Sequence, residues 1–266
     1  MKDCEKPLII FLFSGNARTS PFSYEVNDRN YKILKSYTEY VFTDEFKKKY
    51  NFRIYVTTDN IHLQDIKDYF KEINIGNIHL IGKNYEIDYY MKHIDNKLDN
   101  INSYMDVYNS KDWSYYDKYE NSIHQHYKIM DCYNLFENEN DIKQCTFIVR
   151  LRMDIEFTEN ILRILTLLEE DPYIQIFMHW DFFAIGKPEI MRCYCNGLKG
   201  NYGNYNFKTV VPEFLPVMID YNHLERKRWT YAPERQLFEM LFEYCNNNKL
   251  ELHKTIKSVE CCMIVR

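Results

Sequence analysis

The sequence predicts an α/β fold in which a mixed, mostly parallel sheet carries helices on both faces. Apolar runs typical of buried strands alternate along the chain with segments of helical periodicity, which is the pattern of a parallel sheet covered by helices. Hydrophobic residues make up 45% of the 266 positions, enough for one sizeable core. Neither an internal repeat nor a linker divides the chain, so we expect a single domain over residues 1–266.

The first strand is predicted from a continuous apolar run that ends in "SGN". Such a run fits a buried parallel strand that leaves the sheet into a loop. Helical spacing follows between Ile33 and Val41, and strands and helices then alternate regularly. The predicted elements of this part are a strand at 7–13, a helical region ending near 41, a strand at 52–59, a helix at 61–73 and a strand at 78–82.

The second part of the chain continues the alternation after residues 84–119, where no clean period appears and we expect loops or short helices. A helix from Glu120 is predicted to bury one stripe of apolar side chains, namely Ile123, Tyr127, Met130 and Leu135. A charged strand follows at 147–157. Thr158 is then expected to cap a helix over 159–171, which Asp171-Pro172 ends.

The last third of the chain is expected to begin with strand at 173–186. Residues 196–230 hold most of the later Gly, Asn and Pro and are predicted to form a long functional loop or subdomain. A final helix is expected from Pro233, a favoured first-turn residue, before a terminal strand.

Charge and composition exclude several classes of protein. The formal net charge is −5, with acidic and basic residues interspersed, so the chain lacks the basic surface of a nucleic-acid binder. No apolar run approaches the roughly 18 residues of a membrane span, and "PLIIFLF" reads as the first strand and not as a leader. Eight cysteines without a signal peptide suggest reduced thiols in the cytoplasm. Zinc ligation by Cys193, Cys195, Cys261 and Cys262 is disfavoured because the usual two-residue spacing is absent.

The stretch "FIVRLRMDIEF", residues 147–157, carries the main chemical signal. Side chains alternate along a strand, so Arg150, Arg152 and Asp154 are expected on one face. In a central strand these charges would each cost several kcal/mol to bury unless they have partners or face a cleft. An arginine fork can grip phosphate oxygens, and a carboxylate can hold a divalent ion against a diphosphate. The alternative is an antiparallel edge strand with a solvated charged face.

Four motifs in this order resemble a known family. They are "HQHYKIMDCYNLF", "FIVRLRMD", "HWDFFAIGKPEIMRCY" and "APERQLFEMLFEY". Together they are similar to nucleotide-sugar glycosyltransferases of the GT-A type, in particular to capsule, lipopolysaccharide and large-DNA-virus enzymes with an R-x-R-x-D strand. The resemblance implies a GT-A-like, Rossmann-type sheet, with a nucleotide-sugar-binding half at about 1–158 and an acceptor-binding half at about 159–266.

The resemblance also implies a site for the donor diphosphate. In the family an Asp-x-Asp signature at the end of a central strand holds a divalent metal, Mn²⁺ or Mg²⁺. Here Arg152-Met153-Asp154 occupies that place, so Asp154 is the expected metal ligand, while Arg150 and Arg152 are expected to contact the donor. Because an arginine can neutralise leaving-group charge without an ion, the substitution puts metal dependence in doubt.

Further donor contacts are expected from the ends of the first two strands and from the preceding helix. Gly15 permits close backbone approach and Arg18 offers a charge for a phosphate, although an ordinary turn explains both equally well. Thr58 or Asp59 would lie near the base or ribose, with a helix N-cap as the alternative. Lys128 would reach the nucleotide, unless it is a solvated helix residue.

Sugar transfer with inversion requires a base that deprotonates the acceptor hydroxyl, and a carboxylate is the usual choice. Glu234 follows Pro233 in a position resembling the family's acidic motif, but the helix dipole alone also favours an acid there. Asp181 is the second candidate, with a strand-end carboxylate bonded to backbone as its alternative. Trp180 beside it is expected to stack on an acceptor sugar.

The sequence therefore predicts an enzyme that moves a sugar from a UDP- or GDP-type donor to a glycan hydroxyl, without nucleic-acid partners or a membrane span. A cytoplasmic location is expected, in the host if the protein is viral. Two alternatives remain. A sugar nucleotidyltransferase shares the architecture but needs a Gly-rich, Lys-containing loop after the first strand, and the chain has only seven glycines. A non-catalytic glycan-binding or assembly protein would use the charged strand structurally.

Overall fold

The computed structural model describes residues 6–14, 28–59, 63–75, 78–83, 119–138, 144–179, 182–196, 241–242 and 244–264. The structural statements that follow concern these residues. Gly15, Arg18, Trp180, Asp181 and Glu234 lie outside them, as do nearly all of the predicted loop regions 84–119 and 196–230 and the start of the helix predicted from Pro233.

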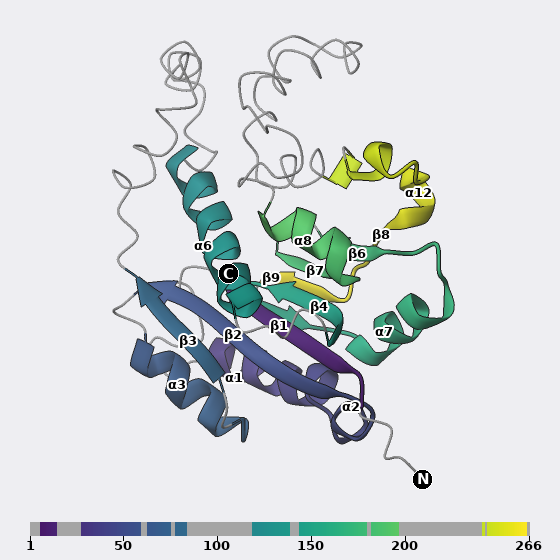
Figure 1. The fold of residues 1–266 in the computed structure, drawn as a ribbon. Helices are drawn as coiled ribbons and strands as arrows, with labels where there is room; N and C mark the ends of the chain where they lie inside the picture. The colour runs from purple at the N-terminus through teal and green to yellow at the C-terminus, as the bar shows by residue number, and fades with distance from the viewer. Residues whose placement is uncertain are drawn as a thin grey trace.

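The centre of the fold is a seven-stranded mixed sheet with the strand order β3-β2-β1-β4-β7-β6-β8 (Figure 1). Within this sheet β7 runs antiparallel to both of its neighbours, whereas the other neighbouring pairs are parallel. The strands are β1 (Leu8–Ser14), β2 (Asn51–Asp59), β3 (Ile78–Lys83), β4 (Cys145–Leu151), β6 (Ile176–His179), β7 (Phe183–Gly186) and β8 (Ile256–Ser258). A separate ribbon pairs β5 (Ile155–Phe157) with β9 (Cys262–Ile264).

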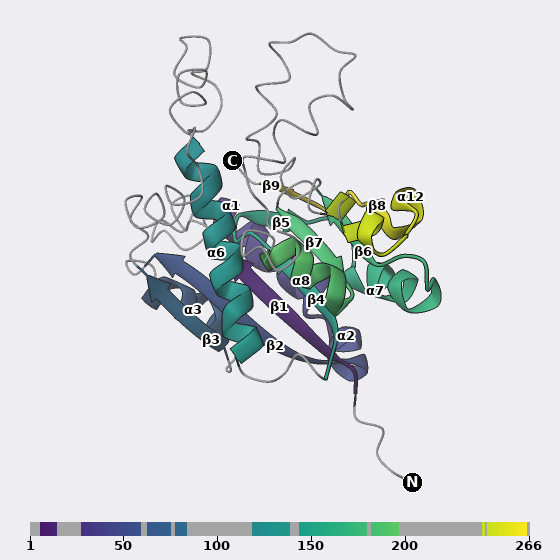
Figure 2. The same cartoon turned by 45° about the horizontal axis from the view of Figure 1, so that its top comes forward.

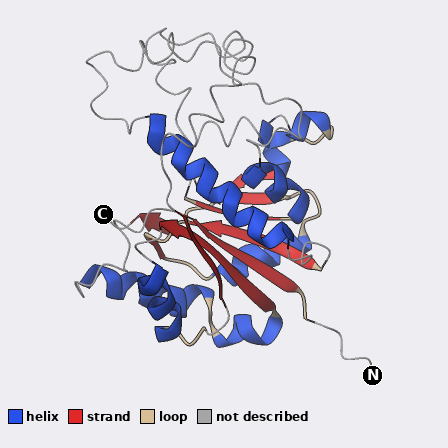
Figure 3. Cartoon of the chain, turned by 60° about the vertical axis from the view of Figure 1, so that its left-hand side comes forward, coloured by secondary structure: helices blue, strands red, loops and turns tan. Residues whose placement is uncertain are grey.

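Helices cover both faces of the sheet, as the sequence predicts (Figure 3). On one face α6 crosses β1 and β2, and α8 packs on β4 and β7 (Figure 2). The opposite face is covered by the segment from α1 to α3, and α7 joins the same core. The helical elements are α1 (Asp28–Ser36), the π-helical turn η2 (Tyr37–Val41), α2 (Asp44–Lys49), α3 (Leu63–Glu72), α6 (Tyr119–Asn138), α7 (Ile161–Glu170), α8 (Pro188–Asn196) and α12 (Leu252–Thr255).

Two hydrophobic cores form, one on each face of the sheet. Alternation along β1 sends Ile9, Phe11 and Phe13 into the core beneath α1 and α3, and Ile10 and Leu12 into the core beneath α6. A strand that is buried on both faces has no polar side, which is why its sequence reads as a continuous apolar run. Each of these large side chains contributes roughly 1.5–3 kcal/mol by leaving water. The predicted fold class is confirmed.

The charged stretch is not one strand. β4 ends at Leu151, Met153 and Asp154 form a turn, and β5 belongs to the separate ribbon. Only Arg150 therefore lies within β4. The prediction that Arg150, Arg152 and Asp154 form a single row on one face of a strand is wrong. The edge-strand alternative is wrong as well, because β4 pairs with β1 on one side and β7 on the other.

Three local expectations need correction. The segment 173–186 folds as a hairpin of β6 and β7. The cap of α7 is Asn160, whose side chain accepts a hydrogen bond from the Leu162 N–H at 2.9 Å, so Thr158 is not the cap. Between Lys128 and Asn138, where the side chains of α6 are described, the buried stripe consists of Ile129, Cys132, Tyr133 and Phe136, at a regular spacing of three and four residues. The predicted Ile123 and Tyr127 lie outside the described side chains. Leu135 lies only at its margin, while Met130 is buried as expected.

Among the residues that the structure describes, no helix is long and apolar enough to cross a membrane. Seven of the eight cysteines fall in this part of the chain, and all seven are free thiols. Cys193 and Cys195 lie in the core beneath α6 and α8, whereas Cys261 and Cys262 lie in the other core. The two pairs therefore cannot share one zinc ion.

Candidate functional site

The carboxyl ends of the three central parallel strands meet at one edge of the sheet. Phe13 of β1 lies opposite Leu151 of β4, and Ser14 lies opposite Thr57 of β2. The end of β1, the Thr57-Thr58-Asp59 end of β2 and the segment after Leu151 are therefore adjacent. Ligands of open α/β sheets bind at this edge, where the loops leave the strands.

Arg150 is a buried cation on the face that α6 and α8 cover. Strand alternation places it with Ile148, and its side chain is 0% exposed. Its Nε donates a hydrogen bond to Ser14 Oγ at 3.4 Å, which ties the ends of β4 and β1 together. The sequence had predicted this arginine as a donor contact, but Ser14 was missed because it reads as an ordinary end of an apolar strand.

A second part of the polar layer joins β2 to α6. The Thr57 hydroxyl donates to the Lys128 backbone oxygen at 2.8 Å, and the Lys128 side chain is buried. Lys128 is thus buried beside the end of β2, and the alternative that it is a solvated helix residue is wrong. Because Thr57 is the register partner of Ser14, Arg150 and Lys128 belong to one continuous polar layer at the end of the strands.

Cys132 belongs to the same layer but is chemically inert. Its Sγ donates to the backbone oxygens of Phe13 at 3.4 Å and Tyr55 at 3.3 Å. Burial raises the pKa of the thiol to about 12, so the nucleophilic thiolate is scarcely populated at neutral pH. Cys132 therefore holds α6 against β1 and β2.

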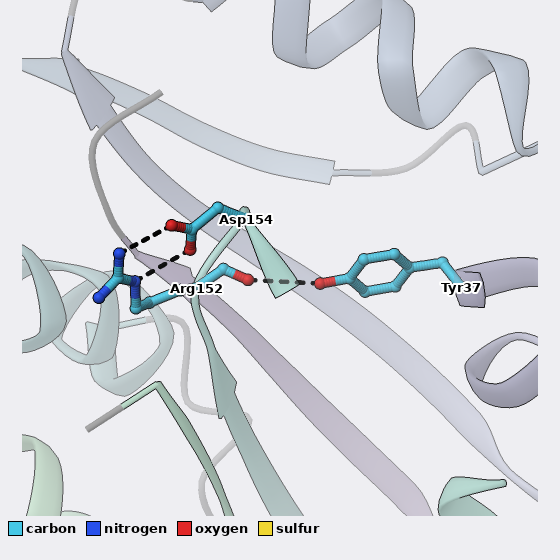
Figure 4. A network of polar contacts seen from close by, with 3 residues as sticks. All are labelled: Tyr37, Arg152 and Asp154. Atoms are coloured by element: carbon cyan, nitrogen blue, oxygen red, sulfur yellow. Dashed lines mark hydrogen bonds and ion pairs between the residues drawn. The ribbon is translucent and has the colours of Figure 1, made fainter. Parts of the chain in front are cut away.

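The second charged group is the pair of Arg152 and Asp154 (Figure 4). Arg152 Nε lies 2.9 Å from Asp154 Oδ1, and Arg152 Nη2 lies 2.7 Å from Oδ2, which is a bidentate fork. The Asp154 side chain is 6% exposed and that of Arg152 is 28% exposed. The carboxylate is thus buried, whereas part of the Arg152 side chain is exposed.

Backbone contacts fix the position of this pair. The Tyr37 hydroxyl donates to the Arg152 carbonyl oxygen at 3.3 Å, from the opposite side of the chain to the ion pair (Figure 4). The Arg152 N–H donates to the Phe182 carbonyl oxygen at 3.0 Å, which continues the pairing of β4 with β7. Tyr37 was not recognisable from the sequence, because its partner is a backbone atom 115 residues away.

The residues at Asp154 do not fit a metal site. Both carboxylate oxygens accept hydrogen bonds from a guanidinium, and a divalent ion on their remaining lone pairs would meet a like charge. Within the described ranges no three His, Cys, Asp or Glu residues are grouped to hold a metal ion.

Thr58 points to the face opposite Thr57 and is fully buried. Its hydroxyl makes no hydrogen bond within the described part of the chain, which is unusual for a buried hydroxyl. Asp59 ends β2 beside it, at the register position of Lys83. Thr58 and Asp59 therefore lie at the same edge of the sheet as Ser14, and their contacts with a nucleotide stay a prediction.

His179 was not predicted, although it ends β6 at the same edge. Its ring lies 4.6 Å from the ring of Phe182, whose carbonyl binds Arg152, and its Nδ1 lies 3.9 Å from Cys262 Sγ. Burial lowers its pKa, so the neutral imidazole is favoured at neutral pH. His253 of α12, by contrast, is exposed and lies 3.5 Å from Glu251 on the surface.

No family model matches the sequence, and no curated protein matches it. Among solved structures, the chain is similar to mouse xyloside xylosyltransferase 1 in its apo form, with 9% identity and a TM-score of 0.47, over 97% of this chain and 86% of that one. It is also similar to 4-diphosphocytidyl-2C-methyl-D-erythritol synthase from Anaerococcus prevotii, with 11% identity and a TM-score of 0.39, over 96% and 86% of the two chains. The fold and site define an α/β protein with a Rossmann-type sheet and a cationic edge.

Proposed function

We propose that the protein is a GT-A-type glycosyltransferase that moves a sugar from a nucleoside diphosphate, of the UDP or GDP type, to a glycan hydroxyl. The observation that carries the proposal is the grouping of Lys128, Arg150 and the Arg152–Asp154 pair around the carboxyl ends of β1, β2 and β4. The proposal includes the resemblance of the R-x-R-x-D stretch to capsule, lipopolysaccharide and large-DNA-virus glycosyltransferases.

The charge of this group supports a diphosphate ligand. The predicted donor residues whose side chains are described supply three cations and one carboxylate. As the sugar leaves, negative charge grows on the diphosphate, and fixed cations in a partly dry site stabilise it more strongly than water does. The buried Thr58 hydroxyl and Asp59 are proposed to bind the nucleoside, and Gly15 and Arg18 to contact the phosphates.

The transfer step needs one proton acceptor. In the inverting reaction the acceptor oxygen bonds to the anomeric carbon, the bond from that carbon to the diphosphate breaks, and the diphosphate takes the electron pair. The hydroxyl proton passes to a carboxylate. We propose Asp181 or Glu234 for this role, with Trp180 stacking on the acceptor sugar. A divalent ion, Mn²⁺ or Mg²⁺, was expected at Asp154, and the geometry there does not support it.

Replacement of Asp154 tests the proposal. Asp154→Asn removes the charge that holds Arg152, and we expect it to abolish sugar transfer and donor hydrolysis while the fold remains intact. Glu159→Gln, which breaks an exposed pair with Arg163, is the matched control and should retain activity. Product formation from UDP- and GDP-sugars is measured, and circular dichroism checks the fold. Full activity of Asp154→Asn would overturn the assignment.

The same assays separate the alternatives. Pyrophosphate released from a nucleoside triphosphate would identify a sugar nucleotidyltransferase instead. A glycan-binding or assembly protein without catalysis would release neither product and would show no response to nucleotides.

A further inference from the structure

We propose that the site binds the donor diphosphate without a divalent ion, and that the Arg152 guanidinium supplies the positive charge that a metal supplies at an Asp-x-Asp signature. This inference rests on the proposed function and goes beyond it, because it specifies how the diphosphate is held. It follows from the geometry of Arg152 and Asp154.

Asp154 is committed to the arginine. Its two oxygens accept from Arg152 at 2.9 Å and 2.7 Å, and its side chain is 6% exposed. Binding a metal there requires the guanidinium to leave or two cations to share one carboxylate. Removing one partner of such a buried pair is strongly unfavourable, because it leaves a charge in a poorly solvated place.

Arg152 is placed to contact a ligand. Its side chain is 28% exposed, beside the buried carboxylate of Asp154. Its backbone is fixed on both sides, by the Tyr37 hydroxyl and by the Phe182 carbonyl. A guanidinium that is oriented in advance loses little entropy when it binds phosphate oxygens.

Asp154 is accordingly a positioning residue that acts through Arg152. Two buried cations add to the positive field at this edge: Arg150 near the end of β4, and Lys128 of α6, whose backbone oxygen accepts from Thr57 of β2. With this arrangement a metal is not required to offset the charge of a diphosphate.

The test is a titration of the full-length protein with UDP and GDP, in EDTA and in Mn²⁺, by isothermal calorimetry. We expect the affinity to differ by less than about threefold between the two conditions, because no metal takes part. Binding in Mn²⁺ that is lost in EDTA overturns the metal-free inference and leaves the proposed function standing. Absence of binding in both conditions overturns the proposed function itself.

Two variants of Arg152 sharpen this result. Arg152→Gln keeps a donor but loses the charge, and we expect at least a tenfold loss of affinity in both conditions, since a charge-assisted hydrogen bond is worth about 1.5–3 kcal/mol. Arg152→Asp restores an Asp-x-Asp pattern and should bind weakly in EDTA but recover in Mn²⁺. Arg163→Gln, on the exposed surface of α7, is the control for loss of an arginine and should bind like the unaltered protein.

Unchanged affinity in Arg152→Gln overturns the role of the guanidinium. Should either variant fail to fold, the comparison of EDTA with Mn²⁺ on the unaltered chain still decides the question. A purely structural role for Arg152 would lower the melting temperature without creating metal dependence in Arg152→Asp.

Discussion

At the scale of single residues, the alternation of side chains along a strand predicts the correct face for Arg150 but the wrong arrangement for Arg152. Arg150 lies inside β4, where side chains alternate, and it needs the partners that burial demands. Arg152 and Asp154 follow the end of the strand, so they meet through a turn and not across one face. After β4 the chain turns into β5, which pairs with β9 in the separate ribbon. Because β9 lies about a hundred residues further along the chain, no local pattern marks the end of β4.

His179 predicts a pH dependence of stability. Its folded pKa lies below the ordinary value of 6.5, because burial disfavours the charged ring. The unfolded chain therefore takes up the proton first as pH falls, so the contribution of this residue is present above about pH 6.5 and is lost below it. We expect His179→Gln to reduce the fall in melting temperature between pH 7 and pH 5.

The exposed His253 provides the control. His253→Gln removes a histidine from the surface of α12 and should leave the melting temperature at pH 7 nearly unchanged. An identical slope for His179→Gln and the unaltered protein would contradict a pKa of His179 that partial burial lowers.

At the scale of elements, the strands β1, β2 and β3 were predictable to within about one residue, because each is a continuous apolar or β-branched run between polar segments. α8 was missed although Pro188 carries the same first-turn signal that was used for Pro233. For α7 the apolar face was correct and the cap was not. Thr158 and Asn160 are both favourable caps, and only the point at which the chain turns into the helix distinguishes them.

The cap of α7 gives a prediction with a control two residues away. Asn160→Ala should lower the free energy of unfolding by about 1 kcal/mol, because the Leu162 N–H loses its acceptor. Thr158→Ala should change it by less than about 0.5 kcal/mol, since the exposed Thr158 side chain does not cap the helix. Urea unfolding at constant slope measures both. Equal losses in the two variants would contradict the assigned cap.

At the scale of the whole molecule, the sequence predicted a mostly parallel sheet but not its order. β7 returns from the second half of the chain and lies antiparallel beside β4. No local pattern specifies which strand it pairs with, because pairing depends on the packing of α8 and on the hairpin with β6. The nucleotide-binding and acceptor-binding halves proposed at 1–158 and 159–266 therefore contribute strands to one sheet.

This shared sheet predicts a single cooperative unfolding transition. β4 and β7 hydrogen-bond across the division between the halves, so neither half can lose its strands without exposing the core of the other. Thermal and urea unfolding followed by fluorescence and by circular dichroism should coincide. Two separated transitions would contradict a single domain.

We propose above that the carboxyl edge of β1, β2 and β4 binds a nucleoside diphosphate. The most direct test of this proposal is a thermal-shift panel of UDP, GDP, dTDP and CMP, each in EDTA and in Mn²⁺, on the unaltered protein and on Arg152→Gln. A diphosphate at a hundred times its dissociation constant should stabilise the fold by about 2.7 kcal/mol. We expect UDP or GDP to raise the melting temperature in both EDTA and Mn²⁺, and Arg152→Gln to lose most of the shift. A melting temperature that no nucleotide changes in either condition would contradict it.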